Sequence, residues 1–220
     1  MWNSQVIIML LEGIRDTLYM TLASTLFGYI IGLPMGIVLT VTDKDGIRPN
    51  AAVYKVLDVI SNLLRSIPPR KSIRAIAGRR RQKAHAHRRI PTATIVPLTI
   101  AAAPYIARMV ESSLKEVDAG VIEAARSMGA SDFQIVTKVM LVEARTSLIV
   151  GATISLGTIL GYSAMAGTVG GGGLGDIAIR YGYTRWQTDI MVVTVVLLVI
   201  LFQIFQTIGM KIANRLDRRK

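Results

Sequence analysis

The sequence predicts an all-α membrane protein, a polytopic bundle of membrane-spanning helices. Two observations carry this prediction. Hydrophobic residues make up 51% of the 220 residues, and they are gathered in long uncharged blocks separated by short charged stretches. About 20 consecutive apolar residues cross the hydrocarbon core of a bilayer as a helix. Four blocks approach or exceed this length, and we expect each to be a span: residues 17–41, 91–108, 146–168 and 190–210.

The first block follows an N-terminal stretch without the basic start or the small-residue cleavage site of a signal peptide. We therefore expect this span to stay in the mature protein. Gly28, Gly32 and Pro34 lie within the block, and such residues suit close helix packing in lipid. Residues 51–67 then carry apolar side chains at helical spacing with charges among them, which predicts an amphipathic helix.

The later blocks differ in their composition. Pro97 and Pro104 interrupt the second block, and membrane helices tolerate proline where neighbouring helices satisfy the freed carbonyl groups. Small residues dominate block 146–168, a glycine-rich loop follows it, and block 190–210 is almost wholly apolar. The sequence contains no visible repeat or separate soluble domain, so we expect one membrane domain over residues 1–220.

The polar segment between the second and third blocks, residues 109–145, contains the signals of two short helices. Gly129 suits the position just after a helix end, and Ser131 with Gln134 makes a capping box that opens the next helix. Two surface helices without a special role would explain this pattern on their own.

The net charge of +12 comes mostly from one short segment. Residues 70–89 hold nine basic residues and no acidic one, and the rest of the chain carries only +3. Such a segment beside a membrane helix attracts anionic lipid headgroups, but without an aromatic residue it does not support nucleic-acid binding. The chain lacks cysteine, and His85 and His87 have no acidic neighbour, so we expect no metal and no other cofactor.

The topology that the four spans imply requires a further span. The basic tail KIANRLDRRK places the C-terminus in the cytoplasm by the positive-inside rule. Counting back, residues 109–145 are cytoplasmic, and both the first span and the span 91–108 run inward. Another span must therefore lie at about residues 60–90. The basic segment 70–89 cannot supply it, because a single arginine or lysine at the bilayer centre costs about 2.5–3.5 kcal/mol.

The polar segment also contains the sequence EAARSMGA. It resembles the EAA signature of ABC importer permeases at four positions: Glu123, Ala124, Ala125 and Gly129. The signature usually has proline where this chain has Val142, which leaves the shape of the following helix open. Residues 65–68, 95–111 and 161–183 look like the permease of bacterial methionine importers in particular.

The resemblance implies a bundle of five spans, of which four are visible here. It also implies a homodimer in the lipid of the bacterial inner membrane, assembled with ATP-binding cassette ATPase subunits and a substrate-binding lipoprotein. Such a permease gives methionine or a similar amino acid a path by alternating access. It is not itself an enzyme, and the chain has no G-x-x-x-x-G-K-[ST] motif for ATP.

The resemblance also implies roles for two sets of residues. Glu123, Ala124, Ala125 and Gly129 belong to the helix that couples the permease to its ATPase, and we expect Glu123 to hold the loop by hydrogen bonds rather than to do chemistry. A second set is a candidate substrate path, because methionine is soft and adaptable against a thioether: Gly161, Tyr162, Ser163 and Met165. Ordinary helix packing through small residues is the alternative for this second set.

A literal G-x-G-x-x-G occurs at Gly170, Gly172 and Gly175. A dinucleotide site needs a strand before this motif, whereas a membrane-length apolar block precedes it here, so that function is rejected. We expect the glycines to let backbones pack closely at the outer mouth.

Two hypotheses about the whole chain follow from the basic segment. Residues 69–94 are the part that does not match the importer permeases, and we interpret them as a short out-of-frame translation closed by a compensating shift. The alternatives are a true insertion or a degenerate copy. The rival functions are a non-transporting membrane protein whose basic loop binds anionic lipid or nucleic acid, and a non-functional, frame-disrupted copy.

Overall fold

The computed structural model describes residues 4–66 and 90–217, which are helical apart from short connections. Neither range contains a strand, so the all-α fold class is confirmed. The elements are α1 Ser4–Thr42, α2 Ala51–Ser66, α4 Ile90–Lys115, α5 Ala119–Ser127, α6 Asp132–Gln134, the π-helix η2 Ile135–Met140, α7 Leu141–Glu143, α8 Arg145–Gly167, α9 Gly173–Ile177, the π-helix η3 Ala178–Tyr183 and α10 Thr188–Leu216.

Among the described residues, α1, α4, α8 and α10 are long and apolar enough to cross a membrane. Each contains most or all of one of the four predicted blocks. α4 continues past Arg108, where the apolar block ends, as far as Lys115. The charges in its last turns do not stop the helix because they are paired along it, Arg108 with Glu111 and Glu111 with Lys115.

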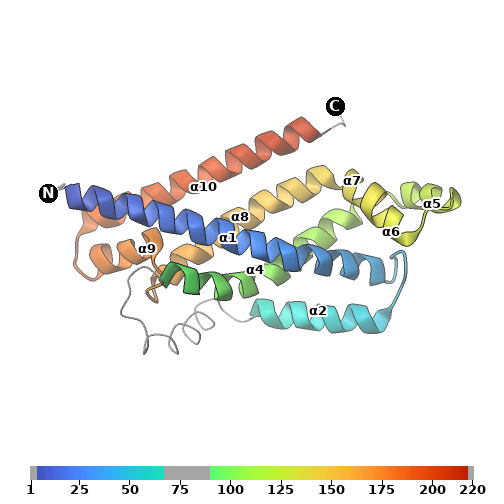
Figure 1. Cartoon of the computed structure of the whole chain (residues 1–220), viewed down its shortest axis with the longest axis horizontal. Coiled ribbons are helices and arrows are strands. Elements are labelled where there is room, and N and C mark those ends of the chain that lie inside the picture. The colour runs from blue at the N-terminus through green and yellow to red at the C-terminus, as the bar shows by residue number, and fades with distance from the viewer. Residues whose placement is uncertain (1–3, 67–89, 218–220) are drawn as a thin grey trace.

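α1 and α4 lie side by side in close contact (Figure 1). A Cβ atom at Gly32 would lie 2.7 Å from the carbonyl oxygen of Ala103, and one at Gly36 would lie 2.6 Å from that of Ala107. These distances leave no room for a side chain. The small residues of α1 therefore allow the two backbones to touch, which is how helices associate in lipid.

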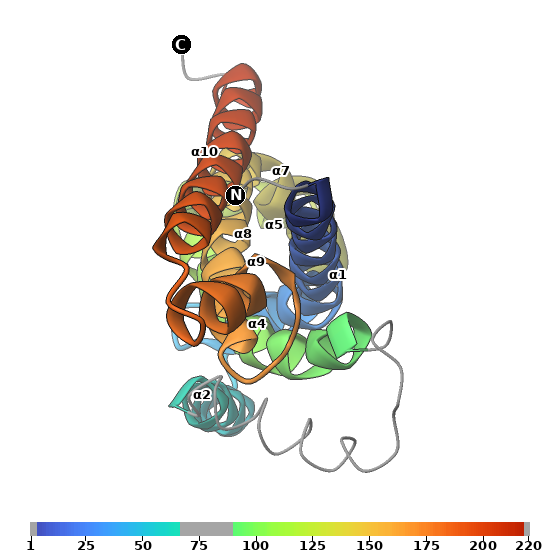
Figure 2. The ribbon, with the colours of Figure 1, turned by 90° about the vertical axis from the view of Figure 1, so that its left-hand side faces the viewer.

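The remaining long membrane helices, α8 and α10, lie on one side of this pair (Figure 2). α8 packs against α4, and α10 packs against α8. Only 6% of the most apolar window of α10 is buried, compared with 61% for α4. An apolar helix with so little burial needs lipid or another protein to cover it.

The connections between helices gather at two opposite ends of the bundle (Figure 1). One end, which we call the α5 end, carries α5, α6, α7 and the connection between α1 and α2, and α10 runs toward it. The N-terminus and α9 lie at the other end, the α9 end. α2 leaves the α5 end and runs back beside α4. This is the direction of the return span that the topology requires.

α2 by itself is short for a span. Its 16 residues extend about 24 Å, whereas the hydrocarbon core is about 30 Å thick. The basic segment 70–89 that follows lies outside the described residues, so the fifth span stays a prediction. The described end of the non-matching segment 69–94 belongs to α4, where the Thr94 hydroxyl donates a hydrogen bond to the Gly171 carbonyl at 3.2 Å.

The glycine-rich loop joins α8 to the short helix α9. Gly172 and Gly173 have φ angles of 87° and 74°, which only glycine adopts readily. A Cβ atom at Gly173 would lie 2.6 Å from the hydroxyl of Thr17 in α1. The loop thus brings backbones together at the α9 end, and because a long helix precedes it, the structure also lacks the strand that a dinucleotide site would need there.

Candidate coupling site and substrate path

α5 is a short helix with a defined beginning and end. Asp118 caps its N-terminus, accepting a hydrogen bond from the Gly120 N–H at 2.6 Å. At the other end Gly129 has a φ angle of 82°, and the Ala130 N–H donates to the Ala125 carbonyl at 3.1 Å. This six-to-one bond is the Schellman ending, so the predicted helix stop at Gly129 is confirmed.

The predicted capping box is also confirmed. The Ser131 hydroxyl accepts from the Gln134 N–H at 3.4 Å, and the Gln134 side chain accepts from the Ser131 N–H at 2.9 Å. The helix that follows changes to π geometry over Ile135–Met140, beside Val142, where the signature proline is missing. A turn fixed from both sides holds α5 at a set angle to this second helix.

The four signature residues, in α5 and in the turn that follows it, differ in how deeply they are buried. Ala125 is 5% exposed and packs in a cluster that includes Ile135, Val136 and Met140. Glu123, Ala124 and Gly129 are exposed. The small side chain of Ala125 sets how closely α5 approaches the helix behind it, and it leaves the opposite face of α5 free.

The exposed face of α5 is more apolar than its sequence suggested. Val121, Ala124 and Met128 share one face by their helical spacing, and Met128 is 82% exposed. Phe133, just beyond the turn, is 76% exposed. In the sequence these side chains are scattered among charges, and only the folded, capped turn shows that they are exposed. Large apolar side chains grouped at a polar end of a membrane protein mark an interaction surface.

The hydrogen bond that holds α5 to the rest of the protein comes from Arg126. Its Nη2 donates to the Ile47 carbonyl oxygen, in the connection between α1 and α2, at 2.9 Å. The neighbouring Glu123 is exposed and makes no side-chain hydrogen bond with the part of the chain that the structure describes. The holding role expected of Glu123 therefore stays a prediction, and the hydrogen bond from Arg126 is a contact that the sequence did not predict.

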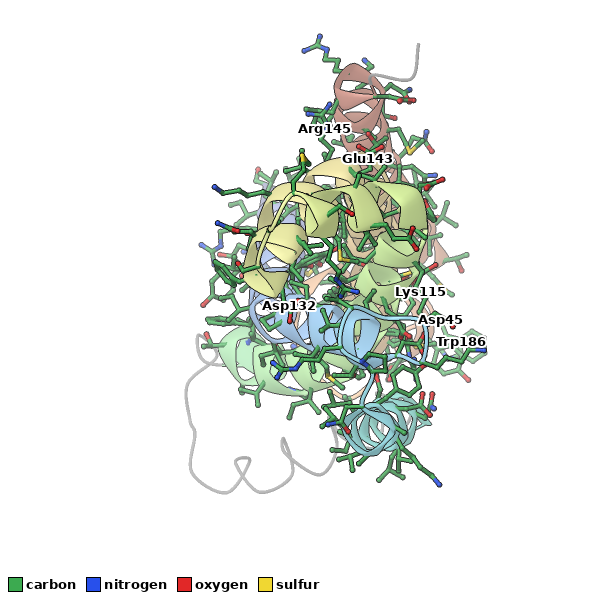
Figure 3. The ribbon with its side chains drawn as sticks, turned by 90° about the vertical axis from the view of Figure 1, so that its right-hand side faces the viewer. Asp45, Lys115, Asp132, Glu143, Arg145 and Trp186 are labelled. Atoms are coloured by element: carbon green, nitrogen blue, oxygen red, sulfur yellow. The ribbon has the colours of Figure 1, made fainter. Side chains whose placement is uncertain are left out.

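A chain of five charged side chains of alternating sign lies behind α5, and the sequence analysis did not find it. Figure 3 shows this end of the molecule, with Lys115 among the labelled residues. Lys115 Nζ lies 2.8 Å from both Asp43 and Glu111, and Arg108 lies 2.6 Å from Glu111 and also pairs with Asp58. The members are Asp58, Arg108, Glu111, Lys115 and Asp43.

Glu111 is the centre of this chain. It is 4% exposed, and the Tyr54 hydroxyl also donates to it, at 3.2 Å. A buried carboxylate needs such donors, because burial without partners costs several kcal/mol. Outside the membrane helices, the hydrogen bond donated by Lys115 holds the pKa of the Asp43 carboxyl below its ordinary value. The chain therefore joins α2 and α4 to the connection that follows α1 through pairs of opposite charge.

The candidate path residues on α8 face two ways. Gly161 and Met165 lie one turn apart and are exposed, with no atom within 4 Å of a Cβ at Gly161. Ser163 is 1% exposed and faces α1, where the Thr21 hydroxyl donates to it at 3.5 Å. Tyr162 is half-buried. Gly161 and Met165 thus lie on one open face of α8, whereas Ser163 packs behind it.

The open face continues along α8 toward the α5 end. Thr158, one turn before Gly161, donates a hydrogen bond to the Tyr105 hydroxyl of α4 at 3.4 Å. Ile154 is 47% exposed one turn further. The face therefore combines polar and apolar groups, as expected for a surface that contacts a polar ligand or a second helix rather than lipid alone.

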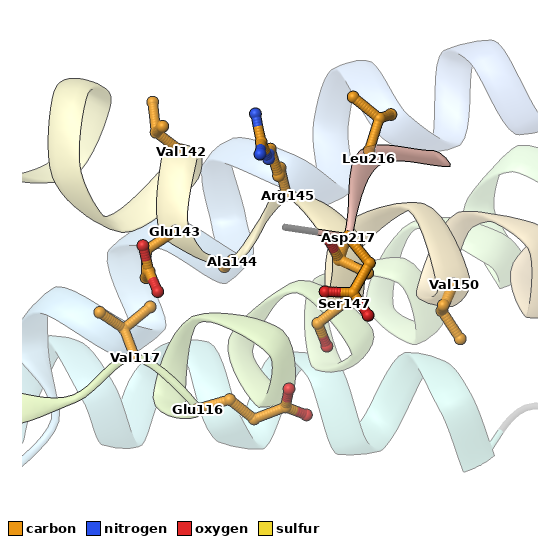
Figure 4. Close-up of a pocket in the computed structure, with 11 residues that line it drawn as sticks. Glu116, Val117, Val142, Glu143, Ala144, Arg145, Ser147, Val150, Leu216 and Asp217 are labelled. Atoms are coloured by element: carbon orange, nitrogen blue, oxygen red, sulfur yellow. The ribbon is translucent and has the colours of Figure 1, made fainter. Parts of the chain in front are cut away.

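A cavity of about 420 Å³ lies where α4, α7, α8 and the end of α10 meet (Figure 4). Charged side chains of both signs line it, among them Glu116, Glu143, Arg145 and Asp217. The path residues of α8 do not contribute to it. We therefore assign the candidate path to the open face of α8 and not to this cavity.

The chain is similar to a known family of membrane transport proteins. A family model described as the binding-protein-dependent transport system inner membrane component matches residues 28–220. The chain belongs to this family. It is thus a membrane component of a binding-protein-dependent transport system, and the non-transporting alternative loses its support.

Two relatives within the family illustrate the likeness. A protein of Vibrio cholerae named probable D-methionine transport system permease protein MetI is 45% identical over 223 residues, which cover 96% of this chain and 93% of the relative. The D-methionine transport system permease protein MetI of Escherichia coli K12 is 44% identical over 170 residues, covering 72% of this chain and 73% of that protein.

Solved structures agree with the family assignment. A chain of the MetNI methionine ABC transporter in an inward-facing conformation is 44% identical, with a TM-score of 0.92 over 99% of this chain and 100% of that one. An amino acid ABC transporter crystallised with histidines has a TM-score of 0.78 at 18% identity, which shows the fold alone. The bundle described above is thus the fold of ABC importer permeases.

Proposed function

We propose that this chain is the permease subunit of an importer for methionine or a similar amino acid, and that a separate ATPase subunit supplies the energy. The observation that carries the proposal is α5, a capped helix with the EAA residues and a free apolar face. The substrate class rests on the relatives, whose names specify D-methionine transport. The chain itself binds no ATP in this proposal and is not an enzyme.

The free face of α5 is the docking surface for the ATPase. Met128 and Phe133 are mostly exposed there, and a groove on the partner would remove them from water. The backbone bonds of the Gly129 turn keep the helix from bending when the partner moves. In this proposal the α5 end is the cytoplasmic end, and the C-terminus lies in the cytoplasm.

The open face of α8 is the path for the amino acid in this proposal. A second copy of the chain would face it across a two-fold axis, so that a homodimer encloses the path. Gly161 leaves room beside the path, and the Met165 thioether contacts the substrate side chain. Tyr162 and Ser163 support this face from the side and from behind. A substrate-binding lipoprotein would deliver the amino acid at the α9 end.

The experiment that tests the proposal reconstitutes the chain with its cognate ATPase subunit and binding protein in liposomes. We expect uptake of methionine that needs ATP. Met128→Glu should abolish stimulated ATP hydrolysis and methionine uptake, because the variant places a charge in the apolar docking groove of the ATPase. Met128→Leu is the matched control and should keep both. Uptake by the M128E complex equal to that of wild type would contradict the assignment of α5.

A second pair of variants tests the path. Met165→Ala should raise the KM for methionine uptake while leaving ATPase binding unchanged, because the truncated side chain no longer contacts the substrate. Val199→Ala, at a mostly exposed position of α10, is the control. An unchanged KM in M165A would remove Met165 from the path.

A further inference from the structure

Two polar contacts hold the connection between α1 and α2, residues 43–50, one just before the coupling helix α5 and one in its last turn. Before α5, Lys115 Nζ lies 2.8 Å from the Asp43 carboxylate. In the last turn of α5, Arg126 Nη2 donates to the Ile47 carbonyl oxygen at 2.9 Å. Two elements far apart in the sequence are thus joined at two separate points.

Apolar packing also joins these two elements, since Ile47 packs against the cluster that contains Ala125 and Met140. A cavity of about 430 Å³ lies there, lined by the α1–α2 connection on one side and by α5 on the other. Asp43, Ile47, Lys115 and Arg126 all contribute to its lining. Because side chains leave this cavity open, the ion pair and the hydrogen bond at its edge supply the directional contacts by which the connection follows α5.

The first contact continues into the membrane. Lys115 also binds Glu111, Glu111 binds Arg108, and Arg108 binds Asp58 of α2. The side chain of Glu111 is 5% exposed and those of Arg108 and Asp58 are 23% and 33% exposed. Glu111 is the buried member, so separating it from its partners is costly. It therefore ties the partly exposed members of the chain together.

From this geometry we propose that Lys115 and Arg126 are positioning residues of the coupling mechanism. They attach the α1–α2 connection to the coupling helix, so that movement of α5 is passed to α1 and α2 as well as to the helices that flank α5 in the sequence. The inference rests on the proposed function. It adds a second route by which the ATPase moves the spans, through Asp43 and Ile47.

The test measures coupling itself, as substrate molecules transported per ATP hydrolysed, in the reconstituted complex. Asp43→Asn should lower this ratio about fivefold, the effect of losing one partly exposed ion pair, while ATPase binding persists. Asp45→Asn is the matched control. Asp45 is in the same connection and pairs with Lys44, but both side chains are more than four-fifths exposed, at 82% and 84%.

Three further variants separate positioning from a merely structural role. Lys115→Met and the double variant D43N/K115M should transport the same number of substrate molecules per ATP hydrolysed. Both variants remove the Lys115–Asp43 ion pair, and once Lys115 is gone the D43N change has no further effect on that pair. Arg126→Gln breaks the second contact and leaves the ion pairs intact, so it should lower the ratio without changing thermal stability as much as K115M does.

The outcomes distinguish the two proposals. A wild-type complex without ATP-dependent methionine uptake overturns the proposed function, and this inference with it. A wild-type complex that transports, with D43N and R126Q at the wild-type ratio, overturns this inference alone. Effects of D43N and K115M that multiply in the double variant would also contradict it, since the two residues would then act separately.

Discussion

The Thr17 hydroxyl of α1 accepts a hydrogen bond from the Leu174 N–H at 2.9 Å, at the start of α9. The same hydroxyl donates to the Gly13 carbonyl at 2.8 Å, and Thr17 is 2% exposed. One side chain thereby satisfies a buried backbone group of the glycine-rich loop and fixes that loop to the first span.

This contact predicts the effect of exchanging the hydroxyl for a methyl group. Thr17→Val keeps the volume but leaves the Leu174 N–H without its partner, which costs about 1–3 kcal/mol. Thermal unfolding in detergent should show a lower midpoint for T17V and a nearly unchanged one for Thr17→Ser, which keeps the hydroxyl. Equal midpoints for T17V and wild type would show that the loop finds another partner.

The glycines of α1 and α8 predict opposite effects of alanine. Gly36→Ala should destabilise the bundle, because its Cβ would lie 2.6 Å from the Ala107 carbonyl oxygen and force α1 away from α4. Gly161→Ala meets no atom within 4 Å, and alanine favours a helix over glycine by about 0.5–1 kcal/mol. Midpoints of unfolding should fall for G36A and rise slightly for G161A; the reverse order would refute the packing argument.

Much of the fold was predictable from the sequence because a bilayer imposes simple rules on length and hydrophobicity. The four apolar blocks, the stop at Gly129 and the Ser131 capping box depend on residues close together in the sequence, and the structure confirms them. The predicted second span ends at residue 108 because charged residues follow it in the sequence, whereas α4 continues to Lys115. The helix goes on because Glu111 lies within reach of both Arg108 and Lys115.

The parts that the sequence did not predict depend on contacts between distant segments. Asp43, Asp58 and Lys115 each look like ordinary solvated charges in the sequence, and only the approach of α1 and α2 to α4 makes them one chain. The division of the α8 residues is similar, since Ser163 and Met165 are two positions apart but face opposite ways. Their proposed roles in the path stay untested.

The buried carboxylate at the centre of the charged chain predicts a large effect of neutralisation. Glu111→Gln removes the carboxylate that Arg108 and Lys115 share, although Arg108 keeps Asp58 and Lys115 keeps Asp43, so we expect a cost of about 1.5–3 kcal/mol. The midpoint of thermal unfolding in detergent should fall. Glu116→Gln, at an exposed position five residues on, is the control and should behave like wild type. A stable E111Q would mean that the chain of pairs contributes little.

Asp43 predicts a pH dependence of stability. Its pKa is lowered in the folded protein by the hydrogen bond from Lys115, so the carboxylate contributes stability that is present above the ordinary pKa, about 3.9. That contribution is lost as pH falls through the lowered folded pKa. The midpoint difference between wild type and D43N should therefore be largest near neutral pH and shrink below about pH 4. A difference independent of pH would assign the effect to packing.

The basic segment predicts a result at the level of the gene. The described α2 leaves the α5 end in the direction of a return span, yet residues 70–89 carry nine basic residues and cannot cross a bilayer. We expect resequencing of codons 65 to 95 to reveal two compensating frame shifts, with an apolar run of about 20 residues in the restored frame. With five spans, α1 can run inward while the coupling helix and the C-terminus both lie on the cytoplasmic side. A single open frame that encodes Arg70–Arg89 in independent isolates would end this hypothesis, and the missing span would predict that this chain does not transport.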